Sequence, residues 1–202
     1  MSPAKRCFDL LVAGLLALVL WPVALVIALV ILVVDGRPVF HVSERMKTPD
    51  ISFHLWKFRT MRPVAGDMGV SGGDKSDRIT RMGHILRRTR LDEIPQLINI
   101  LRGDISLVGP RPPLRRYVEL FPSLYAEVLK QRPGLTGLAT LVYHRTEERL
   151  LRNCATPQET EEVYTRRCVP RKARLDLIYA EKKGICLDFR LILATAFRFF
   201  LP

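Results

Sequence analysis

The chain has 202 residues, of which 48% are hydrophobic and 26% charged, with 32 lysines and arginines against 20 acidic residues and a formal net charge of +12. This length favours one compact domain with its own core. The positive charge favours anionic partners such as nucleic acid, acidic lipid headgroups or phosphorylated substrates. The cysteines lie far apart and form no C-x-x-C pair, which argues against a disulfide framework and against a zinc site.

The first strong feature is an uncharged apolar run, Leu10–Val34. Its length exceeds the ~18 apolar residues that mark a transmembrane helix. A signal peptide is disfavoured, because the run is too long and no small-residue cleavage site follows it. Basic residues lie on both sides, so the positive-inside rule selects no orientation; they are Lys5, Arg6, Arg37, Arg45 and Lys47.

Pro22 stands near the middle of this run and would break the helical hydrogen bond to the carbonyl of Leu18. Two topologies fit: a kinked transmembrane span, or a re-entrant hairpin with both charged ends on the cytoplasmic face. Each half, Leu10–Trp21 and Val23–Val34, would form about 18 Å of helix, enough for one leaflet of a ~30 Å hydrocarbon core. The sequence alone does not separate the two topologies.

The chain becomes soluble in character after Gly36. Short apolar alternation at 39–42 and 51–58 predicts two strands or an interfacial β-hairpin, which ends with the basic side chains of Lys57 and Arg59 on one face. The glycine-bearing segment Val64–Ser76 is predicted to be a flexible loop. It lacks the terminal Lys-Ser/Thr of a Walker phosphate loop, so we assign it no catalytic role.

The most informative stretch is 87–97, in which Asp92 and Glu93 follow three arginines. It reads as a helix start, with Thr89 and Asp92 at capping-box spacing. Orphan N–H groups and arginine charge are expected to hold Asp92 ionised and to attract other anions. Such a carboxylate can serve as a nucleophile or a metal ligand. A capped surface helix whose acids pair with neighbouring arginines explains the same residues.

The following segment combines a helix, a strand and an arginine held between prolines. The helix is predicted from about Asp92 to Gly103, with the apolar residues Ile94, Leu97, Ile98 and Leu101 facing inward. A short strand at 105–108 then leads into Gly-Pro-Arg-Pro-Pro. The prolines restrict the backbone on both sides of Arg111, whose side chain suits bidentate phosphate binding. A surface turn is the alternative.

The remaining elements are predicted to be mostly helical. They are an amphipathic helix at 117–130, a rigid turn at 132–137, a charged helical region at 147–183 and a segment rich in Phe and Leu at 187–201. The last segment is too short to span a membrane. It can lie in the headgroup region or pack in the core.

Several motifs in this order resemble one protein family, the small monotopic phosphoglycosyl transferases. These bacterial sugar transferases initiate lipid-linked glycan assembly. The matching landmarks cover nearly the whole chain: Lys5-Arg6-Cys7-Phe8-Asp9, Pro22, residues 57–61, 91–97, 103–112 and 132–137, and Asp176, Tyr179, Leu187-Asp188 and Thr195.

The resemblance implies a helix-rich α+β fold, with a re-entrant membrane helix-hairpin at 1–36 and a catalytic domain with interfacial amphipathic helices at 37–202. It implies transfer of a sugar-1-phosphate from a nucleotide sugar, expected to be a UDP-sugar, to a polyprenyl phosphate. Asp92 would form a covalent phosphosugar intermediate, Glu93 would assist, and Mg²⁺ would bridge Asp92 and the diphosphate. UMP would be released.

The resemblance also implies roles for other residues and a location. Phosphate binding is expected from Arg111, Arg87, Lys57 and Arg59, weaker substrate contacts from Arg132, Thr136 and Arg145, and membrane-helix anchoring from Lys5, Arg6, Asp9 and Pro22. The expected location is the cytoplasmic face of the bacterial inner membrane, as a monotopic protein. A homodimer is among the expected partners and nucleic acid is not.

Three departures from the family pattern leave the donor sugar open. Trp21 replaces the usual serine before the proline, Ser43–Lys47 replaces Gln-x-Arg-x-Gly, and Leu138–Leu141 replaces Trp-Ala-Gln-Val. Two functional alternatives also remain. One is a membrane-anchored basic module that binds nucleic acid or acidic lipid, and the other is a membrane-bound phosphohydrolase that uses the same aspartate.

Overall fold

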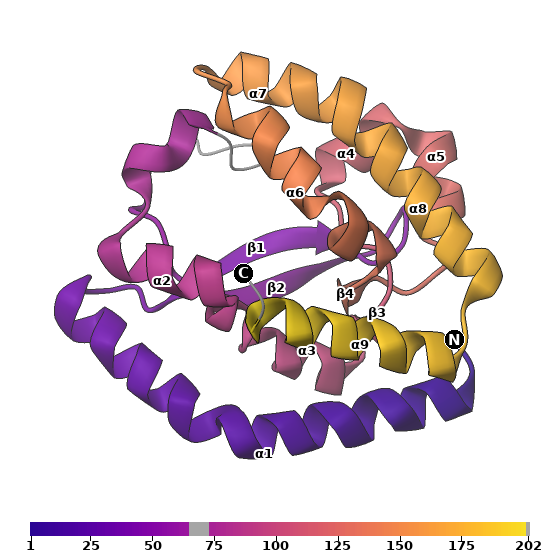
Figure 1. Cartoon of the computed structure of the whole chain (residues 1–202), viewed down its shortest axis with the longest axis horizontal. Coiled ribbons are helices and arrows are strands. Elements are labelled where there is room, and N and C mark those ends of the chain that lie inside the picture. Colours follow the sequence, from indigo (N-terminus) through magenta and orange to yellow (C-terminus); the bar gives the residue numbers. More distant parts are fainter. Residues whose placement is uncertain (65–72, 201–202) are drawn as a thin grey trace.

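The computed structural model describes the backbone of residues 1–64 and 73–200, and most of the predicted flexible loop lies outside these residues. The described chain is a helix-rich α+β fold with two small sheets, as predicted (Figure 1). The strands are β1 (Phe40–Met46), β2 (Ser52–Phe58), β3 (Ser106–Val108) and β4 (Gly134–Thr136). The helices are α1 (Pro3–Val34), α2 (Arg81–Thr89), α3 (Gln96–Arg102), α4 (Arg115–Leu120), α5 (Pro122–Val128), α6 (Leu138–Arg152), α7 (Pro157–Val163), α8 (Val169–Lys182) and α9 (Ile185–Phe200), with short turns η1 (Gly73–Arg78), η2 (Leu91–Glu93) and η3 (Tyr164–Cys168).

Helix α1 is continuous through Pro22. Its N-terminus is capped by Ser2, whose side chain accepts a hydrogen bond from the backbone N–H of Lys5. Figure 1 shows that α1 bends along its length, and its second half turns toward α2. The two halves considered in the sequence analysis are therefore joined in one bent helix. Its re-entrant placement in a bilayer stays a prediction.

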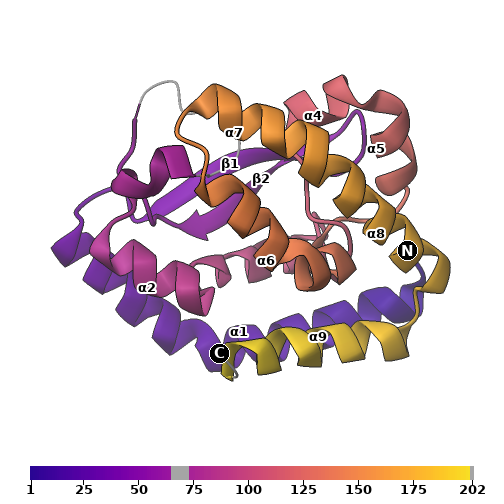
Figure 2. The same cartoon turned by 45° about the horizontal axis from the view of Figure 1, so that its top comes forward.

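Most side chains of α1 face outward. Within the described residues, α1 is the one helix long and apolar enough to cross a membrane. Its inner face packs through Ala13 against α3 and β3, and through Ile27 and Ile31 against Leu86 of α2. Figure 2 shows α9 running alongside α1, and Leu191 of α9 is buried in the same cluster as Ala13.

The predicted β-hairpin is confirmed. Strands β1 and β2 pair antiparallel, with Phe40 opposite Phe58 and Met46 opposite Ser52. The second sheet was not predicted in full: the expected rigid turn at 132–137 contains β4, which pairs in parallel with β3. This pairing needs glycine, because a Cβ on Gly134 would lie 2.1 Å from the backbone nitrogen of Gly109.

The helix predicted from Asp92 to Gly103 is divided in two. Asp92 lies in the 3₁₀ turn η2, and α3 begins only after Pro95. Leu97 is buried as expected, but Ile98 and Leu101 are 45% and 41% exposed, so the inward orientation predicted for these two is wrong. Asp92 and Glu93 therefore lie in the short connection between α2 and α3.

The C-terminal half covers the β1–β2 sheet with helices. The helix predicted at 117–130 is interrupted at Phe121, where α4 ends and α5 begins with Pro122. Helices α4 to α8 enclose one hydrophobic core that includes Tyr117, Tyr125 and Val169. Helix α9 is partly buried, while Phe189 and Phe197 are exposed, so it contributes both to the core and to the apolar surface.

Candidate active site

Glu93 is the centre of a group of cations. Its carboxylate lies 3.1 Å from Arg111 Nη2, 3.6 Å from Arg90 Nη1 and 3.7 Å from Lys57 Nζ. These partners come from the loop after β3, the end of α2 and strand β2. Burial would raise the pKa of Glu93, but the three neighbouring charges lower it to about 2. Glu93 is therefore a permanent anion that holds three cations together.

Asp92 lies beside this group but is bonded differently. The carboxylate is 7% exposed, and within the described part of the chain it accepts no hydrogen bond. Burial raises the pKa of Asp92, while the charges of Lys57 and Arg87 oppose this shift. The neighbouring cations act on Asp92 in the expected direction, but the loss of hydration outweighs them, so its pKa lies above the ordinary value. That Asp92 is ionised stays a prediction.

Arg87 comes from α2 and Lys57 from β2, and the charge of each acts on Asp92. Arg87 Nε donates a 2.9 Å hydrogen bond to Thr60 Oγ1. Burial lowers the pKa of Arg87, opposed by Asp92. Burial also lowers the pKa of Lys57 to about 8, opposed by Glu93. A desolvated cation gains more from an incoming anion than a hydrated one, so both side chains are suited to phosphate.

Arg111 is held by a loop whose backbone is tied on both sides. The carbonyl of Pro110 accepts from Gly134 at 2.8 Å, and the carbonyl of Pro113 accepts from Met46 at 3.0 Å. These bonds connect the loop to β4 and to β1, in addition to the restriction that the prolines impose. The direction of the Arg111 side chain is thus set by the two sheets.

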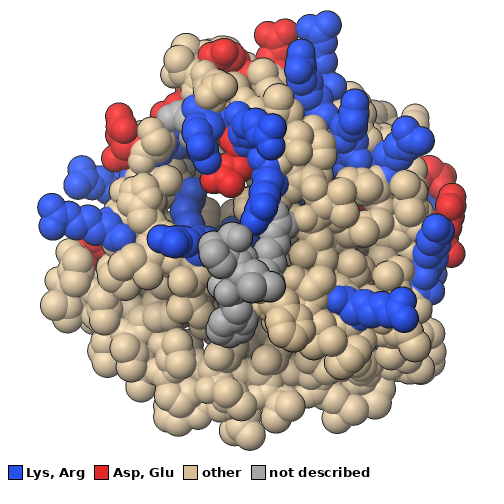
Figure 3. All heavy atoms as spheres, in the orientation of Figure 1, with Lys and Arg blue, Asp and Glu red and all other residues tan. Residues whose placement is uncertain are grey.

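The surface shows the same arrangement. In Figure 3, Lys and Arg side chains gather around a hollow in the upper part of the view, with acidic side chains inside it. The lower edge of that face, where α1 runs, shows no charged side chain. A charged hollow above an uncharged stretch of surface is what an enzyme needs if it acts on an anion next to an apolar phase.

Arg59 is placed outside this group. Its guanidinium donates to the carbonyls of Asp35, Gly36 and Arg37 at 2.6, 2.8 and 2.8 Å. These carbonyls follow the last turn of α1, where backbone acceptors lack helical partners. Arg59 is 6% exposed, and we therefore assign it to holding the end of α1 and not to phosphate binding.

The three residues predicted to make weaker substrate contacts also lie elsewhere. Arg132 is beside Arg6, whose charge adds to burial in lowering its pKa. The hydroxyl of Thr136 lies 2.7 Å from that of Thr195 in α9, and Arg145 is exposed on α6. Among the described contacts of Asp92 and Glu93, none involves these side chains.

The comparison with known proteins decides the class. The sequence matches the family described as bacterial sugar transferase over residues 1–202. The chain belongs to this family.

Curated relatives agree with the assignment. The chain is 32% identical over 201 residues to a UDP-glucose:undecaprenyl-phosphate glucose-1-phosphate transferase of Klebsiella pneumoniae, and 31% identical over 201 residues to the protein of that name in Escherichia coli K12. Each match covers 98% of this chain and 40% of the relative. It is 37% identical over 204 residues to the exopolysaccharide production protein PSS of Rhizobium leguminosarum, covering 95% and 92%. The chain thus spans about 40% of the first two relatives and nearly all of the third.

The predicted anchoring residues of this sugar transferase tie α1 to the rest of the molecule. Lys5 Nζ donates to a carboxylate oxygen of Asp188 in α9. Arg6 donates to two backbone carbonyls in the last residues of α3, at 2.7 and 2.9 Å. Asp9 is fully buried and accepts from Ser106 Oγ in β3 at 2.7 Å. Pro22 lies inside α1, away from these contacts.

The transferase site has a donor set that suits Mg²⁺ bound together with a substrate. Mg²⁺ is usually held by one or two carboxylates plus substrate phosphates. Asp92 offers a carboxylate that is free of hydrogen bonds in the described structure, whereas Glu93 is shared among three cations. No group of three His, Cys, Asp or Glu side chains occurs among the described residues. Of the two acidic residues, Asp92 is therefore the one whose carboxylate is available to hold such an ion.

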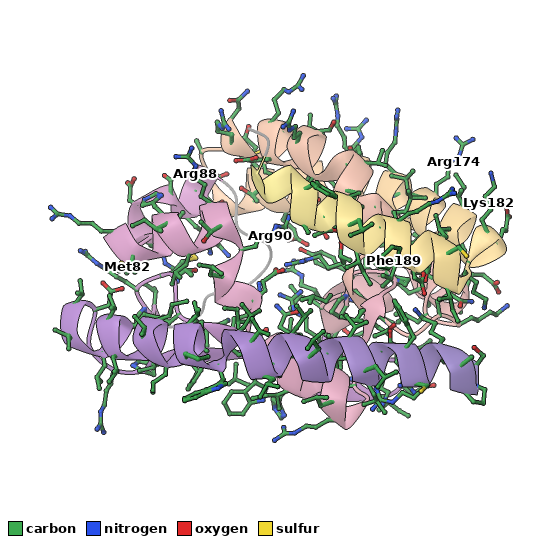
Figure 4. All side chains as sticks on the ribbon, turned by 60° about the horizontal axis from the view of Figure 1, so that its bottom comes forward. Met82, Arg88, Arg90, Arg174, Lys182 and Phe189 are labelled. Atoms are coloured by element: carbon green, nitrogen blue, oxygen red, sulfur yellow. The ribbon has the colours of Figure 1, made fainter. Side chains whose placement is uncertain are left out.

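Two arginines of the site were not predicted as site residues. Arg90 adopts a left-handed backbone conformation with φ of 54° and thereby reaches Glu93. Figure 4 shows Arg90 near the end of α2, above α1. Arg45 in β1 is close enough to Arg111 for the two charges to interact. The only available signal for Arg45 was its place in the altered Gln-x-Arg-x-Gly motif.

Proposed function

We propose that this sugar transferase moves a sugar-1-phosphate from a nucleoside diphosphate sugar to a polyprenyl phosphate. The observation that supports this most directly is the unequal acidic pair. Glu93 is fixed by Arg111, Arg90 and Lys57, whereas Asp92 has no hydrogen bond among the described residues and faces two cations. A desolvated carboxylate beside cations is the arrangement that nucleophilic attack on a phosphate requires.

In the first step, an oxygen of the Asp92 carboxylate attacks the phosphorus that bears the sugar. The new aspartyl O–P bond forms as the bond from this phosphorus to the bridging oxygen breaks. That oxygen keeps the electron pair and leaves as part of a nucleoside monophosphate, which is UMP for a UDP-sugar. Lys57, Arg87 and Arg111 surround the negative charge that develops on the phosphate oxygens.

In the second step, an oxygen of the polyprenyl phosphate attacks the same phosphorus. The aspartyl O–P bond breaks, the product is a polyprenyl diphosphate sugar, and the carboxylate of Asp92 is regenerated. Both steps are displacements at one phosphorus, so the sugar keeps its bond to phosphate throughout. Mg²⁺ bound to Asp92 and the diphosphate would neutralise phosphate charge and align the leaving group.

The proposed setting is the cytoplasmic face of the bacterial inner membrane. The outer face of α1 presents large exposed apolar side chains, including Leu11, Leu15, Leu18 and Val33, and α9 adds Phe189. Burying this surface in lipid would be favourable by about 25 cal/mol per Å². With α1 re-entrant, the protein would be monotopic and the charged hollow would face the headgroups, where the lipid phosphate lies.

The test uses the purified full-length chain with Mg²⁺, a UDP-sugar labelled on the phosphate next to the sugar, and polyprenyl phosphate. Asp92→Asn should abolish release of UMP, while the matched exposed variant Asp50→Asn should leave it unchanged. Without acceptor, the label should be trapped on Asp92 and identified by peptide mapping. An active Asp92→Asn enzyme, or label on another residue, would overturn the proposal. Free sugar phosphate as the main product in the presence of acceptor would indicate a phosphohydrolase instead.

A further inference from the structure

Arg45 is a cation without an anionic partner next to the active site. Its guanidinium makes one long hydrogen bond, 3.4 Å from Nη1 to the carbonyl of Pro112. Its Nε is buried and has no hydrogen-bond partner. No ion pair of Arg45 occurs among the described residues, although β1 holds it beside the loop that carries Arg111. A buried donor without a partner is unfavourable unless a ligand supplies the acceptor.

A second cation, Arg111, is close enough for its charge to act on Arg45. Burial, followed by the charge of Arg111, lowers the pKa of Arg45 to about 10. Arg45 therefore stays charged at neutral pH, and its hydrogen bond to the carbonyl of Pro112 places this charge at the loop that also carries Arg111. Glu93 neutralises Arg111 but is only a minor influence on Arg45. An anion placed between Arg45 and Arg111 would satisfy both.

The interactions of the cations distinguish two ends of the site. Arg87 interacts with Asp92 and Thr60 at one end. Lys57 and Arg111 occupy the middle, around the acidic pair. Arg45 interacts with Arg111 and with the carbonyl of Pro112 at the other end. Cations at two ends of one site can bind two phosphate groups besides the one that is transferred.

The Arg87 end is the one next to α1. Leu86, which precedes Arg87 in α2, packs against Ile27 and Ile31 of α1. The cap of α2 also contacts the end of α1, because Thr80 Oγ1 donates to Asp35 Oδ2 at 2.9 Å. Figure 4 shows α2, with Met82 labelled, lying directly above α1. A lipid whose chain remains beside α1 would present its phosphate at this end.

The Arg45 end is near the core formed by helices α4 to α8. Tyr164 and Tyr117 contribute to the pKa of Arg45, and both belong to the core formed by α4 to α8. Tyr164 opens the π-helical turn η3, a rare conformation that is frequent at functional sites. A water-soluble ligand can approach this end without contact with lipid.

We propose that Arg45, together with Arg111, binds the phosphate of the leaving nucleoside monophosphate, and that the acceptor phosphate is bound at the Arg87 end. This assignment rests on the proposed function, since it names the subsites of the same reaction. The bridging oxygen gains negative charge as its bond to phosphorus breaks. A guanidinium that contacts this phosphate stabilises the charge and afterwards holds the nucleoside monophosphate as product.

The test compares Arg45→Gln, Arg45→Lys and Arg87→Gln in the full-length chain. Arg115→Gln is the matched control, because Arg115 is an exposed arginine that pairs with Glu44, the neighbour of Arg45. For Arg45→Gln, the Kd for UMP and the KM for the nucleotide sugar should rise by about 10- to 100-fold, with the KM for polyprenyl phosphate unchanged. Arg45→Lys should show a smaller rise in this Kd and KM, because lysine keeps the positive charge but loses the bidentate hydrogen bonding of the guanidinium group. For Arg87→Gln, the KM for polyprenyl phosphate should rise, while the Kd for UMP and the KM for the nucleotide sugar stay unchanged.

UMP binding also separates this proposal from the proposed function. It is measured in the Asp92→Asn background, where no chemistry is required. If Arg45→Gln weakens UMP binding there, the subsite stands even if the covalent step fails. Unchanged UMP binding in a variant with the wild-type Tm would overturn the subsite assignment, as would a selective rise in the KM for polyprenyl phosphate. If Arg45→Gln does not fold, UMP affinity of Arg45→Lys equal to wild type would overturn it.

Discussion

Arg111 donates its 3.1 Å hydrogen bond to Glu93 and not to the adjacent Asp92. This single choice gives two neighbouring carboxylates different properties. Glu93 becomes a fixed anion with a pKa of about 2, and Asp92 keeps a raised pKa without a hydrogen bond in the described structure. A basic and unbonded carboxylate is the better nucleophile, because it gives up less stabilisation when it attacks.

The first prediction concerns the acid limb of the pH profile. The charge of Glu93 contributes to the raised pKa of Asp92, so Glu93→Gln should lower that pKa. The acid limb of kcat/KM, which reports ionisation of the free enzyme, should therefore move to lower pH. Because Arg111 and Lys57 also lose their anchor, the maximal kcat should fall by about 10²-fold. An acid limb that stays in place or moves to higher pH would show that it does not report Asp92.

The second prediction concerns the alkaline limb. Lys57 has a pKa of about 8, mainly because of burial, so it loses its proton as the pH rises through this value. The kcat/KM should decline above pH 8, since the neutral amine no longer attracts phosphate. Lys57→Arg should remove this decline, at a lower maximal rate, because guanidinium stays charged. Lys130→Arg, on the exposed surface of the molecule, is the control and should keep the wild-type profile.

The sequence selected a candidate reacting group but did not show its surroundings. Motifs were sufficient to select Asp92, Glu93, Lys57 and Arg111, because phosphate chemistry restricts the residue types that can serve. The raised pKa of Asp92 was not predicted, because burial depends on tertiary packing and is not visible in local sequence.

Arg59 shows a second limit. Its i+2 spacing from Lys57 predicted a shared face, and this rule holds only within a strand. Strand β2 ends at Phe58, so Arg59 turns toward α1 instead. Strand β4 was missed for a related reason, since three residues are too few to show a period.

The third prediction separates the structural arginine from the phosphate-binding one. Arg59→Gln removes the donors to three carbonyls at the end of α1. Each buried group left without a partner costs about 1–3 kcal/mol, so thermal unfolding in detergent should occur several degrees lower, with KM unchanged. Arg87→Gln should change kinetics with little effect on Tm. Arg62→Gln, at an exposed neighbouring position, should do neither. If Arg59→Gln raises the KM while the Tm stays at the wild-type value, Arg59 binds phosphate and the structural assignment is wrong.

The fourth prediction concerns the close approach of α2 to the chain after β2. A Cβ on Gly83 would lie 2.1 Å from the carbonyl oxygen of Thr60, and Thr60 also accepts the hydrogen bond of Arg87. Gly83→Ala should therefore destabilise the protein and reduce activity, although alanine in a helix is normally favoured by up to ~1 kcal/mol. Gly14→Ala in α1, where a Cβ meets no atom within 4 Å, should be neutral or stabilising. Comparable Tm and kcat for both variants would contradict this account.

The last prediction concerns stability and rests on Asp176 in α8. Burial raises the pKa of Asp176 to about 7, opposed by Lys172. Between the ordinary pKa of 3.8 and this value, the folded state binds more protons than the unfolded state. The contribution of Asp176 to the free energy of unfolding should therefore be present at low pH and decline as the pH rises from about 4 to 7, by up to about 1.4 kcal/mol per pH unit. Asp176→Asn removes the titration, so its Tm relative to wild type should be higher at pH 8 than at pH 5. The exposed Asp50→Asn variant provides the baseline, and a Tm difference for Asp176→Asn that is independent of pH would show that Asp176 is ionised in the folded protein throughout this range.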